Sequence, residues 1–409
     1  MYLARIVNRK QLTMLGLNSG TSADGLDMAV VKIRRSTRGV SVKYLAGYEQ
    51  KFSGAMRELV HQMADSDMVT LEDVIELDNL LGNFFGRTAR SFIERLERQR
   101  MKVDVIASHG QTVRHRPEKV RLLGKWIHGT MQLGSLDRIA AATDRITVGD
   151  FRQADIAVGN EGAPITTGAM QRLFAVEQHS RLMVNIGGMA NYFYFPAKDS
   201  PLKISAADCG PGNSLCDLLS RRLFSQPHDS RGRIAASGRL HNELFALLTS
   251  DDFFSGRIVS TGRERFGAAK ADSIIAFGRW YRAKKADLMR TAAELTVYGI
   301  SHKLRPLVNG DHTLTNLYLT GGGRRNIFFV RRLGQLLPEL TIRSADELGF
   351  DADFIEAAAY AVMGEACLRG EALPTTTTNK QADRTRPVLG RIAQPPHRDV
   401  RMSAVRRKG

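Results

Sequence analysis

The sequence predicts a two-lobed α/β protein, and three observations carry this prediction. The chain has 409 residues, which is long for a single hydrophobic core and favours two domains. Short apolar runs with strand character alternate with stretches of helical spacing along its length. Three glycine-rich turns follow predicted strands, at residues 20–25, 187–188 and 321–323. The composition, 43% hydrophobic and 25% charged, is that of an ordinary globular protein.

The first 110 residues predict a meander followed by helices. "TMLGL", "MAVVKI" and "VSVKYLAGYEQKF" are expected to form three antiparallel strands around the first turn. "GAMRELVHQMAD" and "LEDVIELDNLLGNFFGRTARSFIERLERQ" have apolar residues three and four positions apart, which predicts two helices. "VDVIASHG" is predicted to be a short buried strand that runs into a loop.

The rest of the chain repeats the combination of strand, glycine turn and helix. "LMVNIGGMANYFYF" predicts two strands around a turn, and "NLYLTGGGRRNIFFVRRLGQLL" predicts a strand, a turn and a helix. "DADFIEAAAYAVMGEACLRG" predicts a helix of small residues. We expect a first lobe of residues 1–150 with 352–372 and a second lobe of residues 151–351. Residues 373–409 are expected to be a basic, partly disordered tail.

Charge and composition argue against several classes of protein. The formal charge of +17 attracts polyanions, but the sequence has no zinc finger, RNP motif or basic heptad, so we expect no specific nucleic-acid partner. No run of 18 apolar residues and no secretory signal pattern is present, which predicts a cytoplasmic protein without a membrane partner. Cys209, Cys216 and Cys367 form no CxxC pair, so neither a zinc site nor a disulfide framework is expected.

The glycine turns predict phosphate binding. Gly20 and Gly25 are expected to adopt positive φ, and the hydroxyls of Thr21 and Ser22 add donors to the N–H groups of the bend. An ordinary hairpin turn is the alternative for any one of them. Because the device recurs at "NIGGMAN" and at "TGGGRRN", which opens a helix, the three turns together favour an anionic ligand or a nucleotide.

In this arrangement the sequence resembles the actin, hexokinase and sugar-kinase superfamily, and within it the anhydro-N-acetylmuramic acid kinase family. The resemblance extends from about residue 13 to residue 392. It is carried, in order, by "GLNSGTSADGLD", "SHGQTVRHRP", "GDFRQADIAVGNEGAPI", "VNIGGMAN", "DCGPGN", "GRIAASG", "STGRERF", "ELTVYGI", "LTGGGRRN", "IEAAAYA" and "VLGRI".

The resemblance implies an actin-like ATPase of the ribonuclease H-like fold, with ATP and sugar in the interlobe cleft. It implies a kinase that uses ATP, Mg²⁺ and water to open the 1,6-anhydro bridge of anhydro-N-acetylmuramic acid, giving N-acetylmuramic acid 6-phosphate in peptidoglycan recycling. A homodimer is expected on the same ground. The resemblance assigns the nucleotide to Gly20, Thr21, Ser22, Ala23, Asp24, Gly25, Leu26, Asp27, Asn185, Gly187, Gly188, Gly321, Gly322, Gly323 and Asn326.

Asp208 is the predicted catalytic base. It precedes Gly210, Pro211 and Gly212, which are expected to turn a short strand into a helix beginning near Asn213. A helix N-terminus favours an ionised carboxylate, as a base requires, although an Asp in this position can also simply cap the helix. The match of "DCGPGN" to the family's base-containing motif favours the base. Water attack at C1 would then accompany capture of O6 by the γ-phosphate, so that one carboxylate suffices.

Donors for the sugar are expected in "SHGQTVRHRP" and "GDFRQAD". His109, Gln111 and Arg114 are predicted to follow a strand end, and Arg152 could meet the lactyl carboxylate or instead pair with Asp150 or Asp155. Asn18 stands where many superfamily members have an Asp, so the sequence does not identify the ligands of the Mg²⁺ ion. Asp24 and Asp208 are the two candidate ligands.

Two departures from the family pattern bear on the substrate. Asn160 and Glu161 replace Gly and Gln, and Ser135 replaces the usual Asp. Two other functions are compatible with the sequence. One is a kinase of another 1,6-anhydrosugar such as levoglucosan, and the other is a non-catalytic actin-like ATPase or binding module.

Overall fold

The computed structural model describes residues 2–20, 22–37, 39–66, 68–256, 261–375 and 386–396. The chain divides into two compact units. Unit 1 comprises Met1–Ala154, Tyr360–Ala372 and Val388–Gly409, and unit 2 comprises Asp155–Ala359 and Leu373–Pro387. None of the helices among the described residues has the length and apolar character needed to cross a membrane.

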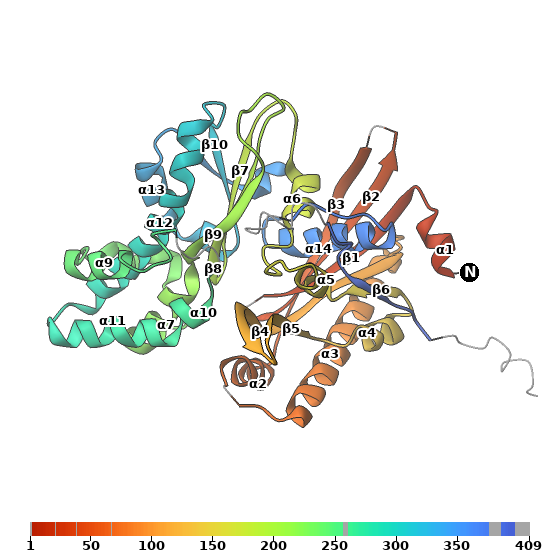
Figure 1. Ribbon diagram of the computed structural model, residues 1–409, viewed down its shortest axis with the longest axis horizontal. Helices are drawn as coiled ribbons and strands as arrows, with labels where there is room; N and C mark the ends of the chain where they lie inside the picture. The colour runs from red at the N-terminus through yellow and green to blue at the C-terminus, as the bar shows by residue number, and fades with distance from the viewer. Residues whose placement is uncertain are drawn as a thin grey trace, which may run out of the picture. The chain divides into compact units, whose positions relative to one another are not determined.

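Unit 1 is built on one mixed sheet. The strands lie in the order β12-β6-β4-β1-β2-β3, with β5 paired to β4. Strands β1, β2 and β3 form the predicted antiparallel meander (Figure 1), and β4 and β6 continue the sheet in parallel. The strand bounds are β1 Gln11–Ser19, β2 Gly25–Ser36, β3 Gly39–Lys51, β4 Val105–Leu122, β5 Lys125–Leu133, β6 Ile146–Gly149 and β12 Arg391–Ala393.

The helices of unit 1 pack where their apolar stripes predict. Helix α3 begins with a capping box between Thr70 and Asp73, and its buried face joins the core of β1, β2 and β4. Gly364 of α14 lies so close to β4 that a Cβ would be 2.6 Å from Cβ of Ala107, which explains the small residues of that helix. The bounds are α1 Tyr2–Val7, α2 Gly54–Asp65, α3 Leu71–Arg98 and α4 Leu136–Thr143; α5 Phe151–Ala157 and α14 Ile355–Leu368 span the division between units.

Unit 2 repeats the same strand order. Its sheet runs β11-β10-β7-β8-β9, in which β7, β8 and β9 form an antiparallel meander and β10 and β11 continue it in parallel. The strands are β7 Arg181–Ile186, β8 Met189–Phe195, β9 Ser205–Pro211, β10 Asn316–Thr320 and β11 Thr341–Ser344. Each unit therefore has a central first strand, two antiparallel strands on one side and two parallel strands on the other. This is the ribonuclease H-like order that the sequence predicts.

Helices cover the sheet of unit 2 around a large apolar core. The 26-residue α12 is its longest described helix and contributes buried side chains along most of its length. The helices are α6 Thr167–Phe174, α7 Asn213–Phe224, η1 Ser230–Gly232, α8 Arg233–Ser237, α9 Asn242–Thr249, α10 Arg263–Phe266, α11 Ala268–Trp280, α12 Lys285–Gly310, η2 Gly322–Arg325, α13 Ile327–Leu336 and η3 Ala345–Leu348.

One predicted element is wrong. The strand that starts at Val105 was expected to end in a loop near Gly110, but β4 continues to Leu122 and pairs with β5. Gly110 has φ +77, so the strand bends there and then resumes. The motif "SHGQTVRHRP" therefore lies on a strand, because a partner strand supplies the hydrogen bonds that a loop would lack. Three residues of the predicted tail, Arg391–Ala393, form β12 against β6.

Candidate active site

The second glycine turn, between β7 and β8, is held by the segment that follows β9. The backbone N–H groups of Gly212 and Asn213 donate to the carbonyl oxygens of Gly188 (2.9 Å) and Gly187 (2.8 Å). A Cβ at Gly212 would overlap the Gly187 oxygen, so only glycine allows this approach. The motifs "NIGGMAN" and "DCGPGN" thus form one structural block.

Asp208 lies in β9, immediately before this block. Its Oδ2 accepts a hydrogen bond from the backbone N–H of Thr261 at 2.9 Å. The residue that caps α7 is Gly212, without a side-chain hydrogen bond, so the capping role considered for Asp208 is excluded.

Two buried polar atoms beside Asp208 have no partner among the described residues. Asn191 is the cross-strand neighbour of Asp208, and its Oδ1 is buried without a hydrogen bond. Oγ1 of Thr261 is buried in the same way. Since buried polar atoms are normally hydrogen-bonded, both atoms are suited to a water molecule or a ligand hydroxyl at the carboxylate.

The third glycine turn packs against the second. Gly321 has φ +72, and a Cβ on it would overlap Oδ1 of Asn185; a Cβ on Gly323 would overlap the side chain of Ile186. Thr320 Oγ1 donates to Asn185 Oδ1 (3.2 Å), and Asn185 Nδ2 donates to Glu356 (2.9 Å). The structure therefore brings Asn185, Gly187 and Gly188 together with the 321–323 turn inside unit 2.

Asn326 follows this turn as the N-cap of α13. Its Oδ1 accepts from the N–H groups of Phe328 (3.0 Å) and Phe329 (3.2 Å). That bonding explains the residue locally and orients the first turn of α13.

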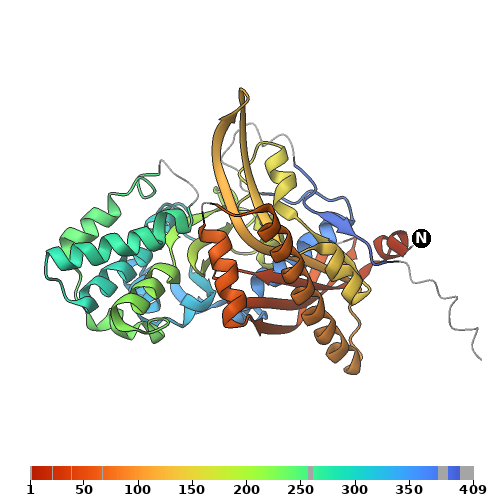
Figure 2. The ribbon, with the colours of Figure 1, turned by 90° about the horizontal axis from the view of Figure 1, so that it is seen from below.

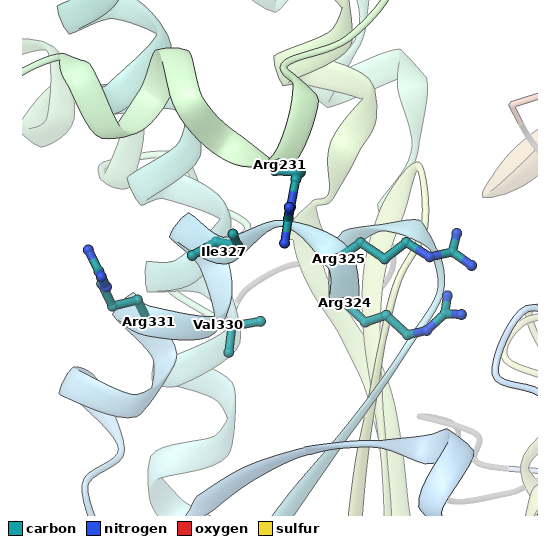
Figure 3. Close-up of a pocket in the computed structure, with 6 residues that line it drawn as sticks. All are labelled: Arg231, Arg324, Arg325, Ile327, Val330 and Arg331. Carbon is teal, nitrogen blue, oxygen red and sulfur yellow. The ribbon is translucent and has the colours of Figure 1, made fainter.

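A cavity of about 730 Å³ adjoins the third turn and α13. Figure 3 shows Arg231 reaching toward Ile327, while Arg324 and Arg325 extend together in another direction. Arg324 and Arg325 are both paired with Asp353, Arg324 at 2.5 Å. The lining has an apolar floor and a cationic rim, which suits a flat aromatic ring carrying anionic groups. It consists of Arg231, Arg324, Arg325, Ile327, Val330 and Arg331.

In unit 1, the first glycine turn is held by a side chain. Gln111 is buried, and its Nε2 donates to the carbonyl oxygens of Gly20 (3.2 Å) and Thr112 (3.2 Å). Its Oε1 lies 2.6 Å from Oγ of Ser19, which is also 2.8 Å from the Gly25 oxygen. Gln111 was expected to contact sugar, but in this structure both of its N–H groups serve the chain.

The expected backbone of this turn is also wrong in one respect. Neither Gly20 nor Gly25 has positive φ; Ala23 does, at +51°. Gly25 is required for another reason, since a Cβ there would overlap the carbonyl oxygen of Gln50. Ser22, Ala23 and Asp24 lie in the turn, and Leu26 and Asp27 begin β2, whereas Thr21 lies outside the described residues.

The side chains of His109 and Arg152 are hydrogen-bonded to each other; the imidazole is uncharged and the guanidinium is charged. Arg152 Nε donates to His109 Nε2 at 3.0 Å, which leaves the ring proton on Nδ1, 3.0 Å from the Gly110 oxygen. Burial, and then the Arg152 charge, hold the pKa of His109 well below its usual value. The ring stacks on Tyr360, with centroids 4.5 Å apart. A neutral imidazole and a guanidinium are thereby fixed side by side.

Other predicted residues are placed differently. Arg114 is exposed and donates to the Ser66 oxygen. The carboxylates considered as ion-pair partners of Arg152 have other contacts: Asp150 pairs with Arg391 (3.2 Å), and Asp155 accepts from Asn160 and Gly162. Sequence reasoning missed the Tyr360 stack and Asn191, although both lie in quoted motifs, "IEAAAYA" and "VNIGGMAN", because no local pattern shows which distant side chain each of them meets.

The described residues contain no group of three or more His, Cys, Asp or Glu side chains that could hold a metal ion by themselves. Asp24, one candidate, pairs with Arg57 at 2.8 Å on the surface.

Comparison with known proteins gives one consistent answer. The sequence model of the anhydro-N-acetylmuramic acid kinase family matches residues 12–395. Proteins of that name include one from Trichormus variabilis, 36% identical over 86% of this chain and 89% of its own, and one from Salinibacter ruber, 30% identical over 96% and 99%. A third, from Caldanaerobacter subterraneus, is 29% identical over 90% and 94%. The chain belongs to the anhydro-N-acetylmuramic acid kinase family.

Proposed function

We propose that this protein is an ATP-dependent kinase that opens the 1,6-anhydro bridge of anhydro-N-acetylmuramic acid and phosphorylates O6. Family membership over nearly the whole chain supports this activity. It does not favour the alternatives of a levoglucosan kinase or a non-catalytic ATPase. The departure at Asn160 is compatible with the muramic substrate, because that side chain is 2% exposed and bonds to Asp155 inside unit 2.

In the proposed reaction, Asp208 accepts a proton from water as the water oxygen bonds to C1. The C1–O6 bond breaks with its electron pair on O6, and O6 bonds to the γ-phosphorus as the bond to ADP breaks. The products are N-acetylmuramic acid 6-phosphate and ADP. The observation that carries this proposal is a carboxylate held by the Thr261 N–H, next to the joined glycine turns and beside two unpartnered buried oxygens.

The remaining residues would bind and orient the substrates. We assign the triphosphate to Asn185, Gly187 and Gly188 in unit 2 and to residues 20–27 in unit 1, and the adenosine to residues 321–323 and the neighbouring cavity. Mg²⁺, held by the phosphates with Asp208 or Asp24, would offset phosphate charge. Arg152, oriented by neutral His109, would meet the lactyl carboxylate. Arg114 remains a candidate sugar ligand, whereas we assign Gln111 to positioning the first turn.

Replacing Asp208 by Asn tests the base. The amide keeps the size and the hydrogen bond from Thr261 but cannot take the proton, so we expect turnover to fall at least about 100-fold. ATP binding should persist. Turnover is measured by mass spectrometry in ¹⁸O-labelled water, where one label at C1 together with phosphate on O6 identifies the coupled reaction.

Asp199→Asn is the matched control, because Asp199 is an exposed carboxylate in the same unit. Near-normal turnover of Asp208→Asn would remove this residue from the mechanism. Offering levoglucosan beside anhydro-N-acetylmuramic acid tests the substrate, and light scattering tests the homodimer that we also propose.

A further inference from the structure

The β4–β5 hairpin ends in a tip, residues 120–127, that extends beyond the other elements of unit 1 (Figure 2). Val120 pairs with Ile127, Arg121 with Trp126 and Leu122 with Lys125, so the turn consists of residues 123 and 124. Nothing in the proposed reaction uses this tip.

Large apolar side chains at the tip face solvent. Leu123 is 95% exposed and Trp126 66%, with Leu122 at 57% and Ile127 at 41%. Side chains alternate between faces along a strand, so Leu122 and Ile127 lie on one face, Trp126 on the other, and Leu123 at the apex. Apolar side chains lie on both faces of this tip, beside Lys125 on one face and Arg121 on the other, whereas a face that packs against another protein would be apolar on one side.

The backbone conformation of the turn does not favour the residue at its first position. Leu123 and Gly124 both have positive φ, at +47° and +78°. A two-residue turn of this kind favours Asn or Gly at its first position, and a leucine there is strained. The turn therefore holds an exposed leucine in a backbone conformation that disfavours it.

Basic residues lie within the tip, at Arg121 and Lys125, and behind it along β4. Between Gln111 and Leu133 the sequence has one acidic residue, Glu118, and five basic ones. All five are exposed: Arg114, Arg116, Lys119, Arg121 and Lys125. An apolar end with cations behind it complements the acyl boundary and the headgroups of an anionic membrane, since long basic side chains can reach back to the headgroup level.

We propose that the hairpin tip inserts into the surface of a bilayer that contains anionic phospholipid. This proposal goes beyond the kinase activity and does not depend on it. The expectation of no membrane partner rested on the lack of an apolar run of 18 residues, but insertion of a turn requires no such run.

Tryptophan fluorescence tests the insertion, because the chain has two tryptophans. Trp280→Phe leaves Trp126 as the reporter, and Trp126→Phe leaves Trp280, which is 83% exposed in unit 2. We expect vesicles of phosphatidylcholine and phosphatidylglycerol to shift the Trp126 emission to the blue and leave the Trp280 emission unchanged. An unshifted Trp126 overturns the proposal. So does a shift that follows protein concentration without vesicles, which would indicate a second copy.

Leu123→Asn separates insertion from charge attraction. Asn-Gly is favoured in this turn, so the hairpin and the kinase turnover should be retained. Loss of the leucine should lower partitioning into the anionic vesicles at least about tenfold. Leu247→Asn, at an exposed leucine (60%) of α9, is the control and should partition as the unaltered protein does. If Leu123→Asn partitions normally, basic charge alone explains binding and insertion is wrong.

Discussion

In unit 1 the first turn of the sheet is held by one side chain from a neighbouring strand, whereas in unit 2 the corresponding turn is held by backbone and side-chain groups of one short segment, residues 212–214. Gln111 binds the β1–β2 turn, while the N–H groups of Gly212 and Asn213 bind the β7–β8 turn. The two sheets have the same strand order. One topology thus accommodates two ways of fixing a glycine-rich bend.

Two buried carboxylates, one from each unit, differ in the charge of their partners. Glu365 of unit 1 accepts from Arg35 (2.7 Å) and Arg369 (3.0 Å), whereas Asp311 of unit 2 accepts only from neutral donors, among them Ser180 and Tyr194 (2.5 Å), in the bonds described. Burial opposes both charges, but these hydrogen bonds outweigh it and lower both pKa values.

The largest expected effect comes from removing these charges. Glu365→Gln removes the buried counter-charge that Arg35 and Arg369 share, leaving Arg35 with Glu371 alone, and should cost about 3–5 kcal/mol of unfolding free energy. Asp311→Asn leaves neutral donors short of an acceptor and should cost about 1–3 kcal/mol. Urea unfolding measures both. Equal losses of unfolding free energy would show that the charge of the hydrogen-bond partners makes no difference to what these two carboxylates contribute.

Gly212→Ala should disrupt the β7–β8 turn of unit 2. The new Cβ would overlap the Gly187 oxygen, so the β9–α7 segment has to move away, at a cost of about 1–3 kcal/mol. Kinase turnover should fall by more than the loss of folded protein alone would cause, because Asp208 lies in the displaced segment. Gly54→Ala, where no atom lies within 4 Å of the new Cβ, is the control for thermal unfolding and turnover.

Gln111→Leu should loosen the β1–β2 turn of unit 1, with a smaller effect on stability. Loss of the amide removes the donor to the Gly20 carbonyl oxygen and one of the two contacts of Ser19 Oγ, which costs about 1–2 kcal/mol. The KM for ATP should rise while the affinity for sugar stays near normal. Gln62→Leu, on the exposed side of α2, is the comparison. A raised KM for sugar alone would instead restore Gln111 as a sugar ligand.

Mild acid should give the smallest effect. The pKa of Glu365 is lowered from 4.5 and that of Asp311 from 3.8, so both groups stabilise the fold above those values. The stabilisation is lost as pH falls through the lower, folded pKa values. Between pH 4.5 and 3.5 the unfolding free energy should fall by roughly 1 kcal/mol. Glu365→Gln should flatten this dependence, and an unchanged slope would contradict the assignment.

Sequence patterns predicted the first meander, the two strands around the second glycine turn, and the strand-to-helix passage at Asp208, because glycine spacing and apolar periodicity are local properties. They failed at β4, where a partner strand carries the chain past Gly110, and at Gly20 and Gly25, where the positive φ falls on Ala23.

By itself, then, the sequence determined the elements, the family and the candidate carboxylate, since these follow from residues close together in the chain. Only the tertiary structure decided that Gln111 faces the first turn, that Gly212 locks the second and that Gly321 meets Asn185. Those contacts join residues that are 24 to 136 positions apart, and no local pattern specifies which distant groups will meet once the sheets form.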